Sequence, residues 1–237
     1  MKNKIQVSIS ILCANFASLS QEIKTIEASG AEMVHVDIMD GHFVKPLTMG
    51  PMIIKALRPL TTLAMDAHLM VEHPETLFDD LAEAGADSVS IHAECFGTLK
   101  AECSGFGRFP KALESFNAAR AAGAIKRIQS LGMKALLTVS PGTEIHLIEP
   151  VLSILDGVLI MSVHPGFSHQ SFIPESLDRV RYVRHRFEGD IAIDGGINDR
   201  TGAQAIDAGA NILATASYFF GDPDPRACVK RLKSGGI

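Results

Sequence analysis

Residues 33–41 read MVHVDIMDG, and the alternation within this stretch decides the fold that we expect for the chain. The segment is apolar and partly β-branched, which is typical of a buried strand. Because side chains alternate along a strand, His35 and Asp37 face one side while Val34 and Val36 face the other. We therefore expect a strand that packs through one face and carries two ligand-type side chains on its second face.

Short apolar runs of the same kind recur along the chain and make eight candidate strands. Their ranges are 6–12, 33–37, 64–69, 88–92, 134–139, 157–161, 191–194 and 211–215. Most are separated by segments with helical apolar spacing, such as Leu77 and Leu81. Gly30, Gly85 and Gly209 each lie where a helix would end just before a strand. The chain therefore repeats a strand-helix unit.

This alternation predicts an α/β protein with a (β/α)8 barrel, or TIM barrel, that forms a single domain over residues 1–237. A chain of 237 residues that is 46% hydrophobic is long enough to bury such a core. An open doubly wound sheet often shows a G-x-G-x-x-G turn, and none follows the first strand. Residues 92–134 exceed what a single crossover needs and include the Gly-rich piece 103–107, so we expect an insertion after the fourth strand.

The charge pattern favours a small-molecule partner. The formal net charge is −5, and Lys and Arg are scattered instead of forming the basic runs that bind nucleic acid or an acidic membrane. The opening MKNKIQVSIS lacks the apolar core of a signal peptide, and no apolar stretch reaches about 18 residues, so we expect a cytoplasmic protein. Four cysteines without C-x-x-C spacing are expected to be free thiols. These are Cys13, Cys95, Cys103 and Cys228.

Four residues at the carboxyl ends of predicted strands are candidate metal ligands. They are His35, Asp37, His68 and Asp194. A TIM barrel builds its active site at this end. Each residue alone would more often be structural, but clustered carboxylates are costly to bury unless a cation or hydrogen-bond donors compensate. The set suits one divalent metal ion, Zn²⁺ or Fe²⁺ first, with Mn²⁺ or Co²⁺ as alternatives. Asp40 and Asp66 are expected to be structural.

Three methionines, Met39, Met70 and Met161, also fall at strand ends. Their residue type favours a role as gap-filling core. The alternative is a soft surface that excludes water beside a reactive intermediate. The sequence leaves both interpretations open.

Three turns after the last predicted strands are candidates for a phosphate site. They are residues 163–167, Gly195-Gly196 and Ala216-Ser217. Backbone N–H groups in the loops after the last strands of a barrel recurrently bind phosphate. Glycine pairs are weak evidence singly, and it is the position of these turns that indicates the site.

Several motifs occur in order along nearly the whole chain. They are Ser10-Ile11-Leu12, HVDIMDG at 35–41, His68-Leu69-Met70, His92-Ala93-Glu94, MSV at 161–163, PGF at 165–167, QSF at 170–172 and Asp194-Gly195-Gly196. The combination closely resembles the ribulose-phosphate 3-epimerase family. The resemblance implies interconversion of D-ribulose 5-phosphate and D-xylulose 5-phosphate.

The resemblance also implies roles for individual residues. His35, Asp37, His68 and Asp194 are implied as metal ligands, and Asp37 and Asp194 as the acid/base pair. The expected substrate and phosphate contacts are Ser10, His68, Met39, Met70, Met161, Gly166, Phe167, Ser168, His169, Gly195, Gly196, Ala216 and Ser217. We also expect a homo-oligomer.

The implied reaction explains why these residue types are needed. Inversion at C3 beside a C2 ketone removes a proton from one face and returns a proton to the other, so two acid/base groups are required. The intermediate is an enediolate, whose developing negative charge a cation can stabilise. Two carboxylates and a metal ion therefore form a sufficient catalytic set.

The chain departs from the family pattern in several loops. Residues 43–46 read FVKP where the family usually has Phe-Val-Pro-Asn, Ser168-His169 replaces Gly-Gly, and Ala216-Ser217 replaces Gly-Ser. Asn-Pro-Gly becomes SPG at 140–142 and HPG at 164–166. None of these changes touches the four candidate ligands, so they bear on the substrate more than on the type of reaction.

Three other functions are compatible with parts of this pattern. The first is epimerisation of a six-carbon ketose phosphate such as D-allulose 6-phosphate, and the second is a non-catalytic sugar-phosphate-binding relative. The third is decarboxylation, as in related barrels with Asp-x-Lys-x-x-Asp after the second strand. In this chain Met39 occupies the Lys position, which argues against a decarboxylase.

Overall fold

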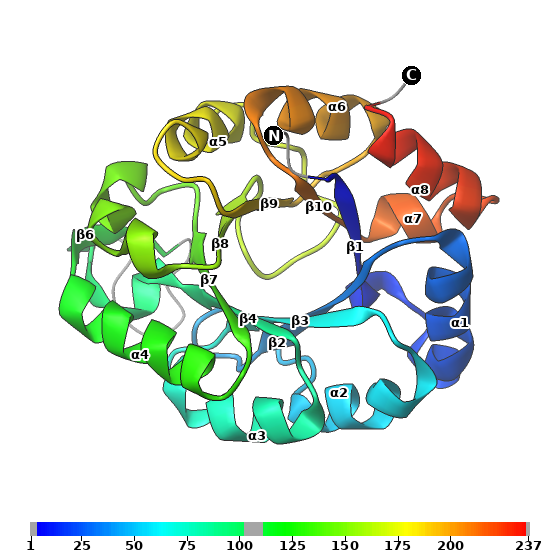
Figure 1. Ribbon diagram of the computed structural model, residues 1–237, viewed down its shortest axis with the longest axis horizontal. Helices are drawn as coiled ribbons and strands as arrows, with labels where there is room; N and C mark the ends of the chain where they lie inside the picture. The colour runs from blue at the N-terminus through cyan, green and yellow to red at the C-terminus, as the bar shows by residue number, and fades with distance from the viewer. Residues whose placement is uncertain (1–3, 102–110, 236–237) are drawn as a thin grey trace.

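The computed structural model describes residues 4–101 and 111–235. Eight parallel strands close into a barrel in the order β1-β10-β9-β8-β7-β4-β3-β2, and helices surround it (Figure 1). The barrel strands are β1 (Gln6–Ser10), β2 (Met33–Met39), β3 (Ala64–Met70), β4 (Ser88–His92), β7 (Lys134–Val139), β8 (Gly157–Met161), β9 (Asp190–Asp194) and β10 (Ile212–Thr215). This confirms the predicted (β/α)8 barrel. A single domain over residues 1–237 stays a prediction.

The helices of the outer ring occupy the predicted crossovers. They are α1 (Leu19–Ser29), α2 (Pro51–Leu57), α3 (Phe78–Ala84), α4 (Ala118–Ser130), α5 (Ser176–Arg184), α6 (Asp199–Ala208), α7 (Ser217–Phe220) and α8 (Pro225–Lys233). Gly30, Gly85 and Gly209 end α1, α3 and α6 in the left-handed region, as predicted. Between β7 and β8 the chain forms a 3-10 helix, Ile145–Ile154, which contains Pro150.

The first strand is shorter than predicted. The run 6–12 suggested a strand through Leu12, but β1 ends at Ser10 and Ile11–Cys13 form a 3-10 turn. Ser10 Oγ accepts the backbone N–H of Leu12 and thereby caps this turn. An apolar composition does not distinguish a strand from such a turn, because both bury the same side chains.

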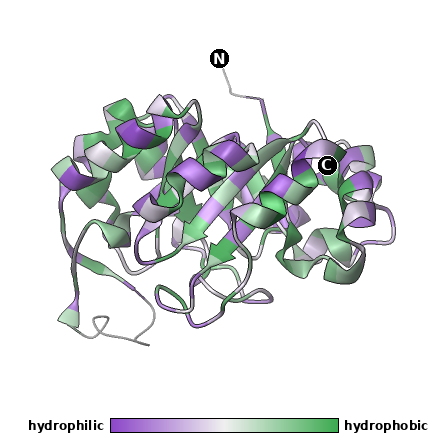
Figure 2. Cartoon of the chain, turned by 90° about the horizontal axis from the view of Figure 1, so that it is seen from below, coloured by the Kyte–Doolittle hydropathy of each residue, from purple (hydrophilic) through white to green (hydrophobic). Residues whose placement is uncertain are grey.

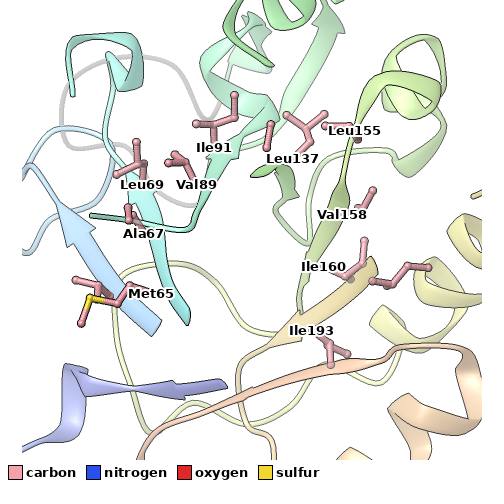
Figure 3. Packing of buried hydrophobic residues seen from close by; sticks show 14 of the residues in the cluster. Met65, Ala67, Leu69, Val89, Ile91, Leu137, Leu155, Val158, Ile160 and Ile193 are labelled. Carbon is pink, nitrogen blue, oxygen red and sulfur yellow. The ribbon is translucent and has the colours of Figure 1, made fainter. Parts of the chain in front are cut away.

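The core has two layers because side chains alternate on every strand. Val34 and Val36 lie with the residues that pack between the barrel and its helices, whereas Met33 belongs to a smaller cluster inside the barrel. Figure 3 shows part of the outer layer, with Leu69 and Ile91 on neighbouring strands. Hydrophilic and hydrophobic stretches alternate along the peripheral helices (Figure 2). One face of β2 thus packs against helices, as residues 33–41 predict.

The segment after β4 carries an antiparallel pair of strands before its helix. The pair is β5 (Gly97–Leu99) and β6 (Leu113–Phe116), and α4 follows. The Gly-rich piece 103–107 and Cys103 lie outside the described residues. The part of the predicted insertion that the structure describes is therefore an addition to the crossover and not a replacement for its helix.

Two further expectations concern cysteines and membranes. Among the described residues, Cys13, Cys95 and Cys228 are free thiols, as expected. Within residues 4–101 and 111–235, no helix combines the length and the apolar character that a membrane span requires.

Candidate functional site

The four candidate ligands converge inside the carboxyl end of the barrel. His35 and Asp37 lie on β2, His68 lies on β3, and Asp194 is the last residue of β9. Strand pairing places Asp37 directly opposite His68. One nitrogen or oxygen atom from each of the four residues lies within 4.8 Å of the others. His35 Nε2 is 3.3 Å from His68 Nδ1 and 3.9 Å from Asp194 Oδ2.

The ring of His35 is held from behind by Asp66. His35 Nδ1 lies 2.9 Å from Asp66 Oδ2, and the hydroxyls of Ser88 and Ser90 donate to the other oxygen of this carboxylate. An ionised carboxylate only accepts hydrogen bonds, so the proton of a neutral His35 lies on Nδ1. Nε2 then presents its lone pair to the cluster. Asp66, which the sequence suggested to be structural, thus orients a candidate ligand.

The electrostatics of the cluster are dominated by carboxylates. Burial alone would lower the pKa of His35, but the nearby Asp37 and Asp66 raise it well above its ordinary value. Burial raises the pKa of Asp194 to about 7; the positive charge of His35 opposes this shift, and the carboxylates of Asp37 and Asp66 add to it. Burial is also the main reason why the pKa of His68 falls to about 4. The protein side chains alone therefore leave excess negative charge in a buried space.

This donor set fits a divalent transition metal. Two imidazole nitrogens and two carboxylates are ligands that Zn²⁺ and Fe²⁺ accept, and a cation among them would compensate the buried charge. The other nitrogens of His35 and His68 already have partners, Asp66 and His92, so the facing nitrogens are directed to one point. His35 Nε2, His68 Nδ1 and oxygens of Asp37 and Asp194 are the atoms that could hold the ion.

A pocket opens above the cluster, and the segment between β8 and α5 lies across the barrel opening (Figure 1). Twelve of the thirteen predicted substrate contacts line it: Ser10, Met39, Met70, Met161, Gly166, Phe167, Ser168, His169, Gly195, Gly196, Ala216 and Ser217. Asp37 and Asp194 also line the pocket. His68, the thirteenth, is fully buried beneath its floor. Val163, His164 and Pro165, which belong to the candidate phosphate turn at 163–167, also line it, and Leu12 and Gln170, to which the sequence gave no role in the site, complete the lining.

The three methionines lie both in the core and at the pocket. Met39, Met70 and Met161 are each 2% exposed, and all three also line the pocket. Met39 and Met70 pack with Phe43 and Val44 in a small apolar cluster. They thus fill the core and cover the polar cluster with surface that water wets poorly.

The turn after β9 requires both of its glycines. Gly195 and Gly196 have φ values of 116° and 64°, which disfavour side chains. A Cβ atom on Gly195 would lie 2.4 Å from Val163 Cγ2, and one on Gly196 would lie 3.0 Å from Phe172 N. Both glycines line the pocket, so this part of its wall is backbone without side chains.

Two of the residues that depart from the family pattern, Ala216 and His169, differ in their backbone φ. Ala216 has a φ of −128°, outside the left-handed region that favours glycine. His169 has a φ of 61°, in the left-handed region where the family usually has Gly. A non-glycine residue in this region costs about 1–2 kcal/mol. Of the described residues other than glycine, His169 is the one with a positive φ, and it lines the pocket.

Comparison with known proteins decides the family. Residues 6–104 and 113–220 match the Ribulose-phosphate 3 epimerase family. The chain belongs to this family. It is 39% identical over 238 residues to a chloroplastic ribulose-5-phosphate-3-epimerase of Arabidopsis thaliana, which covers 98% of this chain and 78% of the relative. It is 37% identical over 235 residues to the ribulose-phosphate 3-epimerase of Bacillus subtilis. This alignment covers 97% of this chain and 98% of the relative.

Solved structures with lower identity support the fold alone. The orotidine 5'-phosphate decarboxylase of Pyrococcus horikoshii aligns with a TM-score of 0.64 at 19% identity, over 98% of this chain and 99% of that chain. The epimerase family and this decarboxylase thus share a barrel. Residues 105–112, which the family match leaves out, fall inside the predicted insertion.

His92 and Glu94 are functional candidates to which sequence reasoning gave no role. They belong to the motif His92-Ala93-Glu94, which contributed to the resemblance to the epimerase family. His92 Nε2 lies 2.9 Å from His68 Nε2, and both side chains are completely buried. Two ionisable residue types at the end of a predicted strand were the available signal. Because His92 follows His68 by 24 positions along the chain, the sequence did not predict the contact between these two side chains.

Proposed function

We propose that this chain is a metal-dependent ribulose-phosphate 3-epimerase that interconverts D-ribulose 5-phosphate and D-xylulose 5-phosphate. The observation that carries the proposal is the pair of carboxylates in one cluster at the pocket, where Asp37 is buried and Asp194 is partly buried. Membership of the epimerase family and the names of the relatives support it. The direct test is to measure metal content and epimerisation of ribulose 5-phosphate in protein purified without chelator.

The carboxylates supply the two proton transfers that inversion requires. One of Asp37 and Asp194 removes the C3 proton from one face of the substrate, and the other returns a proton to the opposite face. Ser10 Oγ donates to Asp37 Oδ2 at 2.5 Å, which fixes the direction of this carboxylate. The buried methionines keep water away while the substrate is an enediolate, and water would otherwise exchange its protons. Each epimer thus uses a different carboxylate as its base.

A single divalent ion completes the proposed site. It would be held by His35, Asp37, His68 and Asp194, with Zn²⁺ or Fe²⁺ favoured and Mn²⁺ or Co²⁺ as alternatives. When bound, the ion supplies positive charge beside the substrate oxygens, where negative charge develops in the reaction. The phosphate would lie against backbone amides of the turns at 166–169, 195–196 and 216–217. A cytoplasmic location and a homo-oligomer stay predictions.

Metal binding should release protons near neutral pH. Asp194, with its pKa raised to about 7, holds a proton below that pH, and His35, with its pKa well above the ordinary value, holds one as well. A metal ion must displace these protons, and each displaced proton lowers the affinity for Zn²⁺ by about tenfold per pH unit at pH values below the pKa of its group. The slope should therefore steepen by one proton as the pH drops below 7, where Asp194 becomes protonated. Chelator competition from pH 6 to 8 measures the slope, and calorimetry in two buffers counts the protons. A slope that does not steepen as the pH falls through 7 would contradict the assignment of Asp194.

The phosphate group should decide substrate recognition. Because the chain carries a net charge of −5, a phosphate dianion must be bound by local donors and not by the overall field. We expect free ribulose to have a kcat/KM at least about 100-fold below that of ribulose 5-phosphate, since lost charge-assisted hydrogen bonds contribute about 1.5–3 kcal/mol each. Equal turnover of free ribulose would refute the assignment of the loops. Including allulose 6-phosphate in the panel tests the hexose alternative, because His169 alters the loop that lines the pocket.

A further inference from the structure

Behind His68, a second histidine and a glutamate extend the cluster away from the pocket. His68 Nε2 lies 2.9 Å from His92 Nε2, and His92 Nδ1 lies 3.0 Å from Glu94 Oε2. The side chains of all three residues have no exposed surface. Neither His92 nor Glu94 lines the pocket. Their contact with the candidate ligands runs through His68.

The carboxylate of Glu94 is fixed from its far side. Glu94 Oε1 accepts the backbone N–H of Ser140 at 3.0 Å and the hydroxyl of Thr143 at 2.5 Å. Arg179 on α5 in turn donates to the backbone carbonyls of Ser140 and Thr143. Two donors occupy Oε1, which leaves Oε2 directed at His92.

The position of protons along this chain of contacts follows from the carboxylate. Because an ionised carboxylate only accepts, the proton of a neutral His92 lies on Nδ1, and His92 Nε2 is then an acceptor. The facing His68 Nε2 must be the donor, so His68 Nδ1 carries a lone pair. This matters because His68 Nδ1 also lies 3.0 Å from Asp37 Oδ1, which by itself would favour a proton on Nδ1.

We propose that Glu94 and His92 are positioning residues that keep the proton of His68 on Nε2, so that His68 Nδ1 is free to bind the metal ion. The inference rests on the proposed metal site and adds residues to it. Asp66 keeps the proton of His35 on Nδ1 through a single contact, which leaves His35 Nε2 free to bind the ion. Partners that orient a metal-binding histidine in this way are worth about 10–100-fold in metal affinity.

Substitution Glu94→Gln tests the proposal at constant size. Ser140 N–H can only donate, so it requires the single oxygen of the amide, and the NH₂ group must then face His92 Nδ1. This reverses the tautomer of His92 and favours a proton on His68 Nδ1. We expect the Kd for Zn²⁺, measured by chelator competition at fixed pH, to rise about 10–100-fold. The matched control is Glu83→Gln, which neutralises an exposed glutamate paired with Lys55.

Affinity of folded Glu94→Gln equal to that of the unaltered protein would overturn the proposal. An absence of Zn²⁺ binding by the unaltered protein would instead refute the metal site itself, so the two failures are distinguishable. A second measurement needs no variant. Nitrogen NMR of the Zn²⁺-loaded, ¹⁵N-histidine-labelled protein should show His92 protonated on Nδ1 and His68 on Nε2. Protonation of His92 on Nε2 would overturn the proposal, and a merely space-filling role would not set this tautomer.

Discussion

Asp37→Asn and Asp194→Asn should each reduce epimerisation by at least about 10²–10⁴-fold, because an amide cannot carry the proton on its face of the substrate. Both carboxylates line the pocket, and both belong to the cluster of candidate ligands. The measurement is kcat/KM for ribulose 5-phosphate with bound metal quantified in each variant. Near-normal epimerisation by either variant would refute the two-carboxylate mechanism. Asp178→Asn, which alters an exposed aspartate on α5, serves as the control.

Proton exchange separates the two carboxylates from each other. In heavy water, a variant that keeps the base facing the C3 proton of its substrate can exchange this proton without completing the inversion. Any residual exchange should therefore depend on which epimer is supplied, and the preferred epimer should differ between Asp37→Asn and Asp194→Asn. Exchange with the same preference in both variants would place the carboxylates on one face.

Stability provides an independent check on Asp194. Its pKa is raised, so its ionised form opposes folding above its ordinary pKa, and the neutral side chain of Asn removes this cost. With metal removed from both proteins, we expect Asp194→Asn to melt no lower than the unaltered protein at pH 8. A loss of activity in this variant would then reflect the missing carboxylate and not unfolding.

His35→Ala and His68→Ala should each abolish tight metal binding and activity together. Residues that merely orient a metal ligand are worth about 10–100-fold in affinity, so losing the ligand itself should cost more. Metal content per folded protein and kcat/KM measured on the same preparation test this coupling. The control is His146→Ala, because His146 is an exposed histidine outside the cluster.

Full metal occupancy in either histidine variant would count against the four-residue site. His35→Ala also leaves the buried Asp66 without its imidazole partner. Removing one partner of a buried ion pair costs about 3–5 kcal/mol, so this variant should also unfold more easily. His68→Ala is the cleaner test, since the pKa of His68 is lowered to about 4 and no ion pair is lost near neutral pH.

The sequence by itself determined the barrel and its candidate ligands. The alternation in residues 33–41 places Val34 and Val36 toward the helices and His35 and Asp37 toward the interior, because alternation is a local property of any strand. Repetition of the strand-helix unit gave the closed parallel barrel. Parallel strands in a barrel bring all their carboxyl ends to one side, so ligands on different strands could be expected to converge.

Only the tertiary structure decided which groups hold those ligands in place. Asp66 contacts His35 and Glu94 contacts His92, while Glu94 is itself fixed by Ser140, 46 positions further along the chain. Such contacts depend on strand register, on side-chain rotamers and on the turn after β7. None of these has a periodic signature in the sequence, since a hydrogen bond between distant segments is set by their packing. The choice of nitrogen on each histidine ring follows from these contacts alone.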